Sequence, residues 1–170
     1  MKSNILIIMG SSRSKGNTYQ IVSTIKEKLA ATLVDLRDYN ISYYDYDHKN
    51  QTDDFLCLAE QMLQYDKIIF ATPVYWYSMS AILKTFFDRL SDLLTIRKDI
   101  GRGLKGKTMY LVICSSDEEK YEGFAMPFEQ TAIYLDMKWG GSVHTWVGEK
   151  GISDDARKEI AAFVGKVRKA

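Results

Sequence analysis

The first apolar segment of the chain, Ile5–Met9, is hydrophobic at every position. Such a run suits a strand that is buried on both faces, as the strands of parallel sheets are. A polar loop, Gly10–Gly16, follows, and apolar residues then recur over 21–29 at the three- to four-residue spacing of a helix face. The pattern predicts a strand, a loop and a helix, with Asn17 or Thr18 as the N-cap of the helix.

The same alternation continues to the end of the chain. Further strands are predicted over Thr32–Leu36, Lys67–Thr72, Thr108–Cys114 and, more weakly because of two adjacent glycines, Trp139–Val147. Further helices are predicted over Asp54–Gln64, Ser80–Leu94, Pro127–Asp136 and Ser153–Arg168, with Leu94 on the apolar face of the second. Strands that alternate with helices indicate an α/β protein, in which one parallel sheet carries helices on both faces.

Handedness restricts how five such strands can be arranged. Right-handed crossovers leave few topologies, and the doubly wound, flavodoxin-like order 2-1-3-4-5 is a common one. Its switch point lies between strands 1 and 3, so a ligand is expected over the loops that follow those strands. A length of 170 residues fits a single domain over 1–170, because no stretch rich in proline, glycine and serine separates two halves.

The loop after the first strand has the composition of a phosphate site. Two glycines permit tight turns, and backbone N–H groups at the start of a helix favour an anion. The loop lacks the glycine patterns of nucleoside-triphosphate and dinucleotide sites, so a terminal phosphomonoester is the expected ligand. A solvated connection whose serines only cap the helix is the alternative. The candidate ligands are Ser11, Ser12, Arg13, Gly16, Asn17 and Thr18, with Ser14 and Lys15 beside them.

The loop after the third strand places three aromatic residues next to one another. They cannot all face one core, so at least one is expected at the surface or against a ligand. Pro73 stiffens the chain there, and an aromatic ring could stack on a planar heterocycle. Packing in the core or at a dimer interface is the alternative. The candidate residues are Pro73, Val74, Tyr75, Trp76, Tyr77 and Ser78.

At these two loops the sequence resembles the flavodoxin-like NAD(P)H-dependent FMN reductases and the related NAD(P)H:quinone oxidoreductases. The resemblance lies in Gly10-Ser11-Ser12-Arg13 with Gly16-Asn17-Thr18, in Pro73-Val74-Tyr75-Trp76 and in the segment 80–90, and it extends to about residue 150. It implies that the first loop holds the FMN phosphate and the second the isoalloxazine. It also implies that the loop after strand 4, with Cys114, Ser115 and Ser116, borders the flavin.

The resemblance further implies an activity. The chain is expected to pass hydride or electrons from NAD(P)H through bound FMN to a small acceptor such as a quinone or free flavin, and to form a homodimer. The cofactor carries this chemistry, so no general acid or base is named. A flavodoxin-type electron carrier is the alternative, although such carriers are usually strongly acidic and this chain has a net charge of +1. A flavin-free module on the same fold is a third possibility.

Composition excludes several other classes. Basic residues are spread along the chain rather than clustered, so nucleic acid is not an expected partner. No apolar run approaches the length of a membrane span, and the apolar run after Met1-Lys2-Ser3-Asn4 is shorter than that of a signal peptide, so a cytoplasmic protein is expected. Cys57 and Cys114 are expected to be reduced thiols, and Cys114 a buried one.

The segment Tyr43–His48 is the remaining unusual stretch. His48 lies near Asp45, Asp47, Asp53 and Asp54, a set that is more typical of a solvated loop than of a metal site. The iron–sulfur branch of the family carries clustered cysteines here, whereas this chain has none, so a cluster is not expected. Tyr43–Tyr46 could cover an active site or contact a partner subunit. The polar run 117–120 after strand 4 is expected to be a solvated loop.

Overall fold

The five predicted strands form one sheet in the computed structural model, which describes residues 4–149 and 151–169. The strands are β1 (Ile5–Met9), β2 (Thr32–Asp35), β3 (Lys67–Pro73), β4 (Thr108–Ser115) and β5 (Lys138–Trp146). They lie in the order β2-β1-β3-β4-β5, and every pairing is parallel. The sequence-based topology is therefore confirmed.

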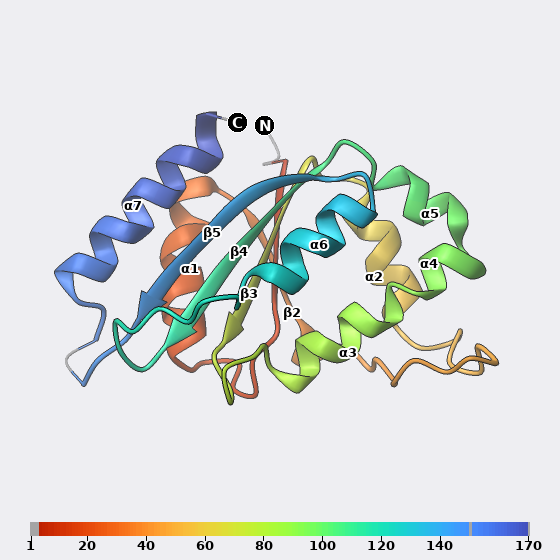
Figure 1. Ribbon diagram of the computed structural model, residues 1–170, viewed down its shortest axis with the longest axis horizontal. Helices are drawn as coiled ribbons and strands as arrows, with labels where there is room; N and C mark the ends of the chain where they lie inside the picture. Colours follow the sequence, from red (N-terminus) through yellow and green to blue (C-terminus); the bar gives the residue numbers. More distant parts are fainter. Residues whose placement is uncertain (1–3, 150, 170) are drawn as a thin grey trace.

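Helices cover both faces of this sheet (Figure 1). One face carries α1 (Asn17–Leu29) and α7 (Asp154–Lys169), and the short 3-10 turn η1 (Leu36–Asp38) follows β2. The other face carries α2 (Phe55–Met62), α3 (Ala81–Arg89), α4 (Asp92–Thr95), α5 (Lys98–Gly103) and α6 (Met126–Tyr134).

The alternation of side chains along β1 explains why that strand is apolar throughout. Leu6 and Ile8 pack into the core beneath α2, α3 and α6, whereas Ile5, Ile7 and Met9 pack into the core beneath α1 and α7. Successive side chains of a strand point to opposite faces, so a sheet covered on both sides buries them all. This central position of β1 fixes the loop that follows it over the middle of the sheet.

The predicted helix Ser80–Leu94 is interrupted at Leu90 and Ser91, which divide it into two helices. The structure ends α3 at Arg89 and begins the short α4 at Asp92, and between them the N–H groups of Leu90 and Ser91 donate to the carbonyls of Phe87 and Asp88, three residues back instead of four. Leu94 is 41% exposed, so it does not belong to the apolar face on which it was placed. The helix α5 was not predicted, since Gly101 and Gly103 weaken its pattern.

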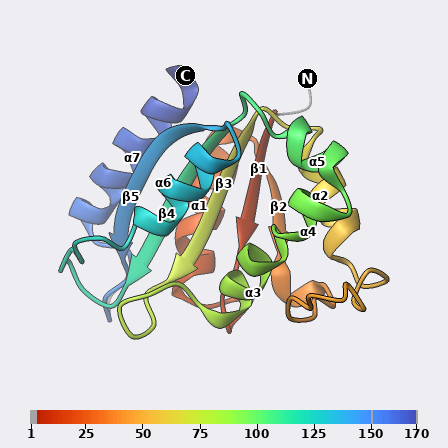
Figure 2. The ribbon, with the colours of Figure 1, turned by 45° about the vertical axis from the view of Figure 1, so that its right-hand side comes forward.

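The carboxyl ends of the strands gather at one edge of the sheet, where the loops after β1, β3 and β4 lie together (Figure 2). The segment 39–54, which follows η1, extends from the same region beside α3 (Figure 2). Among the residues that the structure describes, none of the helices combines the length and the apolar character that crossing a bilayer requires.

Candidate functional site

A cavity of about 350 Å³ lies at the carboxyl edge of the sheet, over the ends of β1, β3 and β4. We call it the switch-point cavity, because strands β1 and β3 begin the two oppositely running halves of the sheet. Its volume lies within the ~300–1,000 Å³ of small-molecule sites. Three loops supply its walls: Ser11, Arg13, Gly16, Asn17 and Thr18 from the first, Pro73, Val74 and Tyr75 from the second, and Cys114, Ser115 and Ser116 from the third.

The first loop presents the start of α1 to the cavity. The helix begins at Asn17 with Gly16 as its N-cap, so the predicted N-cap at Asn17 or Thr18 is wrong by one or two residues. Gly16 offers no side-chain cap, and the first turn carries no acidic residue. The N–H groups at a helix start lack intrahelical partners, and the helix dipole makes that end positive. The end of α1 thus suits an anion.

Close packing shapes this loop. A Cβ at Gly16 would lie 3.2 Å from Arg13 Cβ, which is tight enough to push the arginine away. Ser11 is buried and accepts a hydrogen bond from the Arg13 backbone N–H at 3.3 Å. Ser12 lies outside the cavity lining, exposed to solvent, and its carbonyl accepts a hydrogen bond from the guanidinium of Arg37. The side chains available to a phosphate here are therefore Ser11, Arg13, Asn17 and Thr18.

The second loop makes a two-residue hairpin turn. Tyr75 and Ser78 exchange backbone hydrogen bonds of 2.9 and 3.1 Å, with Trp76 (φ 49°) and Tyr77 (φ 62°) at the tip. Such turns normally place asparagine or glycine at these positive φ positions, because larger side chains are strained there. Trp76 is 94% exposed, and Trp76, Tyr77 and Ser78 stand outside the cavity lining. Only Pro73, Val74 and Tyr75 of the predicted set form its wall.

A buried hydrogen-bond network joins the first two loops. Ser80 Oγ donates to the carbonyl of Gly10 at 2.8 Å and accepts from the Leu83 N–H at 3.2 Å, and the Ser80 N–H donates to Thr72 Oγ1 at 3.0 Å. A Cβ at Gly10 would lie 2.7 Å from Leu83 Cβ, so only glycine allows this approach of β1 to α3. This role of Ser80 was not predicted from the sequence, although a serine directly before a helical pattern is a recognisable N-cap.

The third loop places Ser115 at the end of β4, buried against β5. Its Oγ lies 2.8 Å from His144 Nε2 and also contacts the carbonyl of Asp117. Cys114 is buried, as predicted, and burial raises the pKa of its thiol to about 11, an effect that a hydrogen bond from Thr18 partly opposes. The thiol is therefore protonated near neutral pH and is a poor nucleophile.

Arg89, which the sequence analysis did not single out, organises the tyrosine-containing segment 39–54. It is 1% exposed, forms ion pairs with Asp53 and with Asp92, and donates to the carbonyls of Ser42 and Asn50 at 3.0 and 3.1 Å. Burial opposes ionisation of Asp53, but the hydrogen bonds from Arg89 and from backbone N–H groups outweigh it and hold the pKa of Asp53 below its usual value. The segment is thus fastened to α3 by a buried cation.

The residues weighed as a metal site are engaged elsewhere. His48 Nδ1 lies 3.0 Å from Asp92 Oδ1, Asp53 pairs with Arg89, and Asp54 accepts a hydrogen bond from the Asn40 N–H. Within 4–149 and 151–169, no group of three or more histidine, cysteine, aspartate or glutamate residues could hold a metal ion.

Comparison with known proteins shows the family to which the chain belongs. The family model described as NADPH-dependent FMN reductase matches residues 3–149. The chain belongs to this family. It is a flavodoxin-like, FMN-dependent NAD(P)H oxidoreductase, and the match favours an enzyme over a plain flavodoxin carrier. The chain is 31% identical over 149 residues to the NAD(P)H-dependent FMN-containing oxidoreductase YwqN of Bacillus subtilis strain 168, with 82% of each chain covered.

Solved structures share the fold over nearly the whole chain. The Trp repressor binding protein of Bacillus subtilis superposes with a TM-score of 0.74 at 25% identity, covering 98% of both chains. General stress protein 14 of Treponema denticola, solved in complex with FMN, superposes with a TM-score of 0.63 at 18% identity, covering 96% of this chain and 95% of the other. At that identity, the second match speaks for the fold alone.

Proposed function

We propose that FMN binds in the switch-point cavity with its phosphate on the first loop. The uncapped start of α1, the buried residues Ser11 and Thr18 and the cation of Arg13 all line this cavity and come from the same loop. A phosphomonoester carries the charge and the acceptor oxygens that these donors need. This convergence of a helix start with an arginine and hydroxyls is the observation that carries the proposal.

The second and third loops would hold the flavin ring. Pro73, Val74 and Tyr75 of the second loop and Ser115 and Ser116 of the neighbouring third loop line this part of the cavity. The backbone of the second loop is held in place by two sets of hydrogen bonds. The Val74 N–H donates to the Cys114 carbonyl at 2.9 Å, and the turn beyond Tyr75 is closed by its own pair of hydrogen bonds. A rigid wall holds a planar ring in one orientation, and that is the contribution the protein makes to a flavin reaction.

Bound FMN would supply the redox chemistry between the nicotinamide and an acceptor. The chain binds the phosphate, positions the ring and leaves one face open to the two substrates in turn. Among the described residues that line the cavity there is no carboxylate and no histidine, so the chain supplies orientation rather than acid–base chemistry at this place. We propose a quinone or free flavin as the acceptor, because Trp76 and Tyr77 present exposed rings on which a planar molecule can stack.

We also propose that the protein is a cytoplasmic, single-domain homodimer. Every strand of the described residues belongs to one sheet, which supports one domain. Tyr43, Tyr46, Trp76 and Tyr77 are more than two-thirds exposed and belong to the residue types that interfaces favour. A subunit placed over this aromatic surface would cover the open side of the flavin site. A monomeric mass in light scattering at micromolar concentration contradicts the dimer.

Turnover measurements test the proposed activity. The purified protein, loaded with FMN, should consume NADPH or NADH in the presence of menadione or added FMN. Plots of reciprocal rate against reciprocal NAD(P)H concentration should give parallel lines at different acceptor concentrations, because both substrates use the same face in turn. If neither NADPH nor NADH reduces the bound FMN, the proposed oxidoreductase activity is contradicted. If FMN is reduced but neither acceptor reoxidises it, only the choice of acceptor is wrong.

A further inference from the structure

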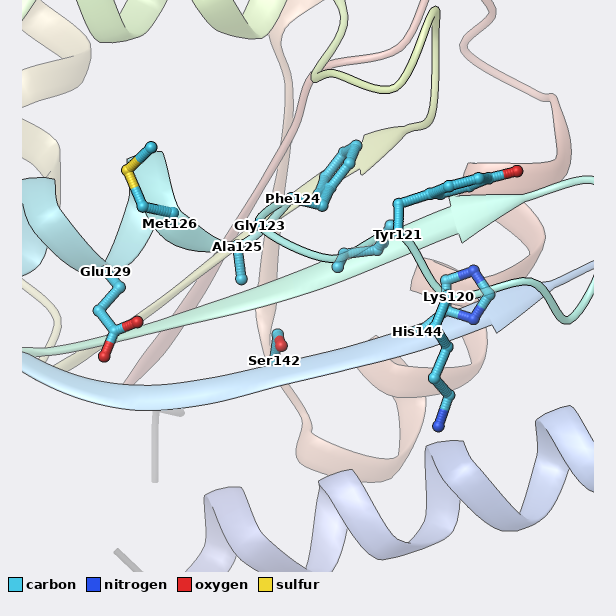
Figure 3. Close-up of a pocket in the computed structure, with 10 residues that line it drawn as sticks. Lys120, Tyr121, Gly123, Phe124, Ala125, Met126, Glu129, Ser142 and His144 are labelled. Carbon is cyan, nitrogen blue, oxygen red and sulfur yellow. The ribbon is translucent and has the colours of Figure 1, made fainter.

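A second cavity, of about 340 Å³, opens beside the edge strand β5 (Figure 3). We call it the edge cavity. Phe124, Ala125 and Met126, at the start of α6, give it an apolar wall, and it shares no lining residue with the switch-point cavity. Lys120 and His144 stand at one end of it and Glu129 at the other (Figure 3). Apolar walls with a few convergent polar groups are typical of ligand sites.

His144 lies between the two cavities. Its ring lines the edge cavity, and its Nε2 atom is 2.8 Å from the Oγ of Ser115, which lines the switch-point cavity. The Ser115 hydroxyl donates to the carbonyl of Asp117, so its oxygen is left to accept a hydrogen from Nε2. The hydrogen-bond network thereby assigns the Nε2–H tautomer, and Nδ1 carries a lone pair. Nδ1 is buried and has no hydrogen-bond partner.

The charges around His144 come from two elements. Lys120 and Asp117 belong to the loop after β4, and Glu159 belongs to α7, while the ring of Trp146 stacks at 5.8 Å. Burial, followed by the positive charge of Lys120, lowers the pKa of His144, so the ring is neutral near pH 7. Lys120 itself is paired only loosely, with Glu159 Oε1 at 3.7 Å. A buried nitrogen without a partner thus lies beside a weakly paired ammonium.

We propose that the edge cavity is a second ligand site, which binds a small aromatic carboxylate whose charged end contacts Lys120 and, after a shift of the side chains that cover it in the structure, His144 Nδ1. The carboxylate supplies the missing partner once Nδ1 takes up a proton from solvent. The imidazolium then donates from Nε2 to Ser115 and from Nδ1 to the ligand, and no electron moves. The ring of the ligand lies along Phe124 and Met126, which favour aromatic contacts. Glu129, at the far end, disfavours a second negative charge.

This site is joined to the flavin site by one hydrogen bond. Ligand binding changes the charge of His144, and Ser115 transmits that change to the wall of the switch-point cavity. Occupancy of the edge cavity should therefore alter the absorbance of bound FMN. It should do so without displacing the flavin, because the two cavities have separate linings.

Benzoate is the probe, titrated calorimetrically into FMN-saturated protein at pH 6 to 8 in two buffers of different ionisation enthalpy. We expect one binding site, uptake of close to one proton per benzoate at pH 7.5 to 8, and an affinity that weakens by up to about tenfold per pH unit above neutrality. Benzamide, which has nearly the same shape without the charge, should bind at least about tenfold more weakly, because a hydrogen bond to a charged group is lost.

Three variants locate the site. His144→Gln should abolish the proton uptake, whereas Lys120→Gln should weaken binding and keep the uptake. Lys158→Gln, a surface change of the same charge on α7 outside the lining, should leave both unchanged. Competition between benzoate and FMN, equal binding of benzamide, or unchanged proton uptake in His144→Gln would each overturn the proposal. A circular dichroism spectrum that matches the parent shows that each variant is folded.

Discussion

The first and second loops line the same cavity, but they differ in whether their most distinctive side chains form its wall. In the first, Ser11, Arg13 and Thr18 line the cavity as their residue types predict, and the positive end of α1 adds to them. In the second, Trp76 and Tyr77 carry the most distinctive side chains and stand at the exposed tip of a turn, while Pro73 and Val74 form the wall. A loop that binds through backbone and hydroxyl groups is easier to interpret from sequence than one whose turn decides where large rings point.

The segment 39–54 differs from both loops, because a buried ion pair holds it in place. Breaking that ion pair should have the largest effect on stability of the changes considered. Arg89→Met removes a buried cation and leaves Asp53 and Asp92 without their partner. Uncompensated buried charge costs about 3–5 kcal/mol, so the unfolding midpoint should fall by roughly 6–20 °C in thermal unfolding followed by circular dichroism. Arg97→Met, which breaks an exposed pair with Asp99, serves as the control and should change the midpoint far less. Equal shifts in the two variants would mean that Arg89 does not fasten the segment.

The first loop is tested by Arg13→Ala. The variant should bind FMN roughly ten- to a hundredfold more weakly than the parent, because it loses a charge-assisted contact of about 1.5–3 kcal/mol. Lys15→Ala is the matched control: it removes the same charge from the same exposed loop but from outside the cavity lining. Fluorescence titration of the apoprotein with FMN measures both. Unchanged affinity in Arg13→Ala, or an equal loss in both variants, would remove Arg13 from the phosphate site.

The turn of the second loop is tested by Trp76→Asn. Asparagine tolerates the positive φ of this position, and the indole makes little contact with the chain at 94% exposure. The free energy of unfolding in urea should therefore rise by about 0.5–1 kcal/mol. Tyr43→Asn replaces an exposed aromatic whose φ is not positive and should give no such gain. A loss of stability in Trp76→Asn would show that the indole packs in the folded protein.

The smallest expected effect is on tryptophan fluorescence, and Trp76→Phe tests it. Trp76 is on the loop beside the proposed ring site, whereas Trp139 and Trp146 lie on β5 at the edge of the sheet. Removal of FMN should raise the emission of the protein, and Trp76→Phe should abolish most of that rise. If the rise persists in Trp76→Phe, the indole of Trp76 is not the main quenched group, Trp146, which pairs with Ser115 across β4 and β5, accounts for the rise, and the ring assignment of Tyr75 and Tyr77 weakens.

The fold could be predicted from sequence because each strand and each of the longer helices α1, α2, α3, α6 and α7 carries its own signal. The all-apolar β1 and the spacing in α1 are local patterns that burial on both faces of a sheet requires. The switch point then follows from topology, and it selects the two loops that border the cavity. The break between α3 and α4 could not be predicted in this way, because neither Leu90 nor Ser91, the two residues between the helices, is a residue type that ends helices.

Long-range polar contacts explain what sequence reasoning missed in the site. Ser80 meets Gly10 across seventy residues, and Ser115 meets His144 across two strands of the sheet. No periodicity connects these residues, and only the register of the strands brings them together. The positive φ angles of Trp76 and Tyr77 could not be predicted either, because nothing in either residue type favours that conformation.

A crystal structure of the protein with FMN tests the central claim most directly. The phosphate should accept hydrogen bonds at the start of α1, from the backbone of residues 16–18 and from the side chains of Ser11, Arg13 or Thr18. The isoalloxazine should lie between Tyr75 and Ser115. A phosphate bound elsewhere, with the first loop contacting only solvent, would contradict the assignment of the switch-point cavity as the flavin site.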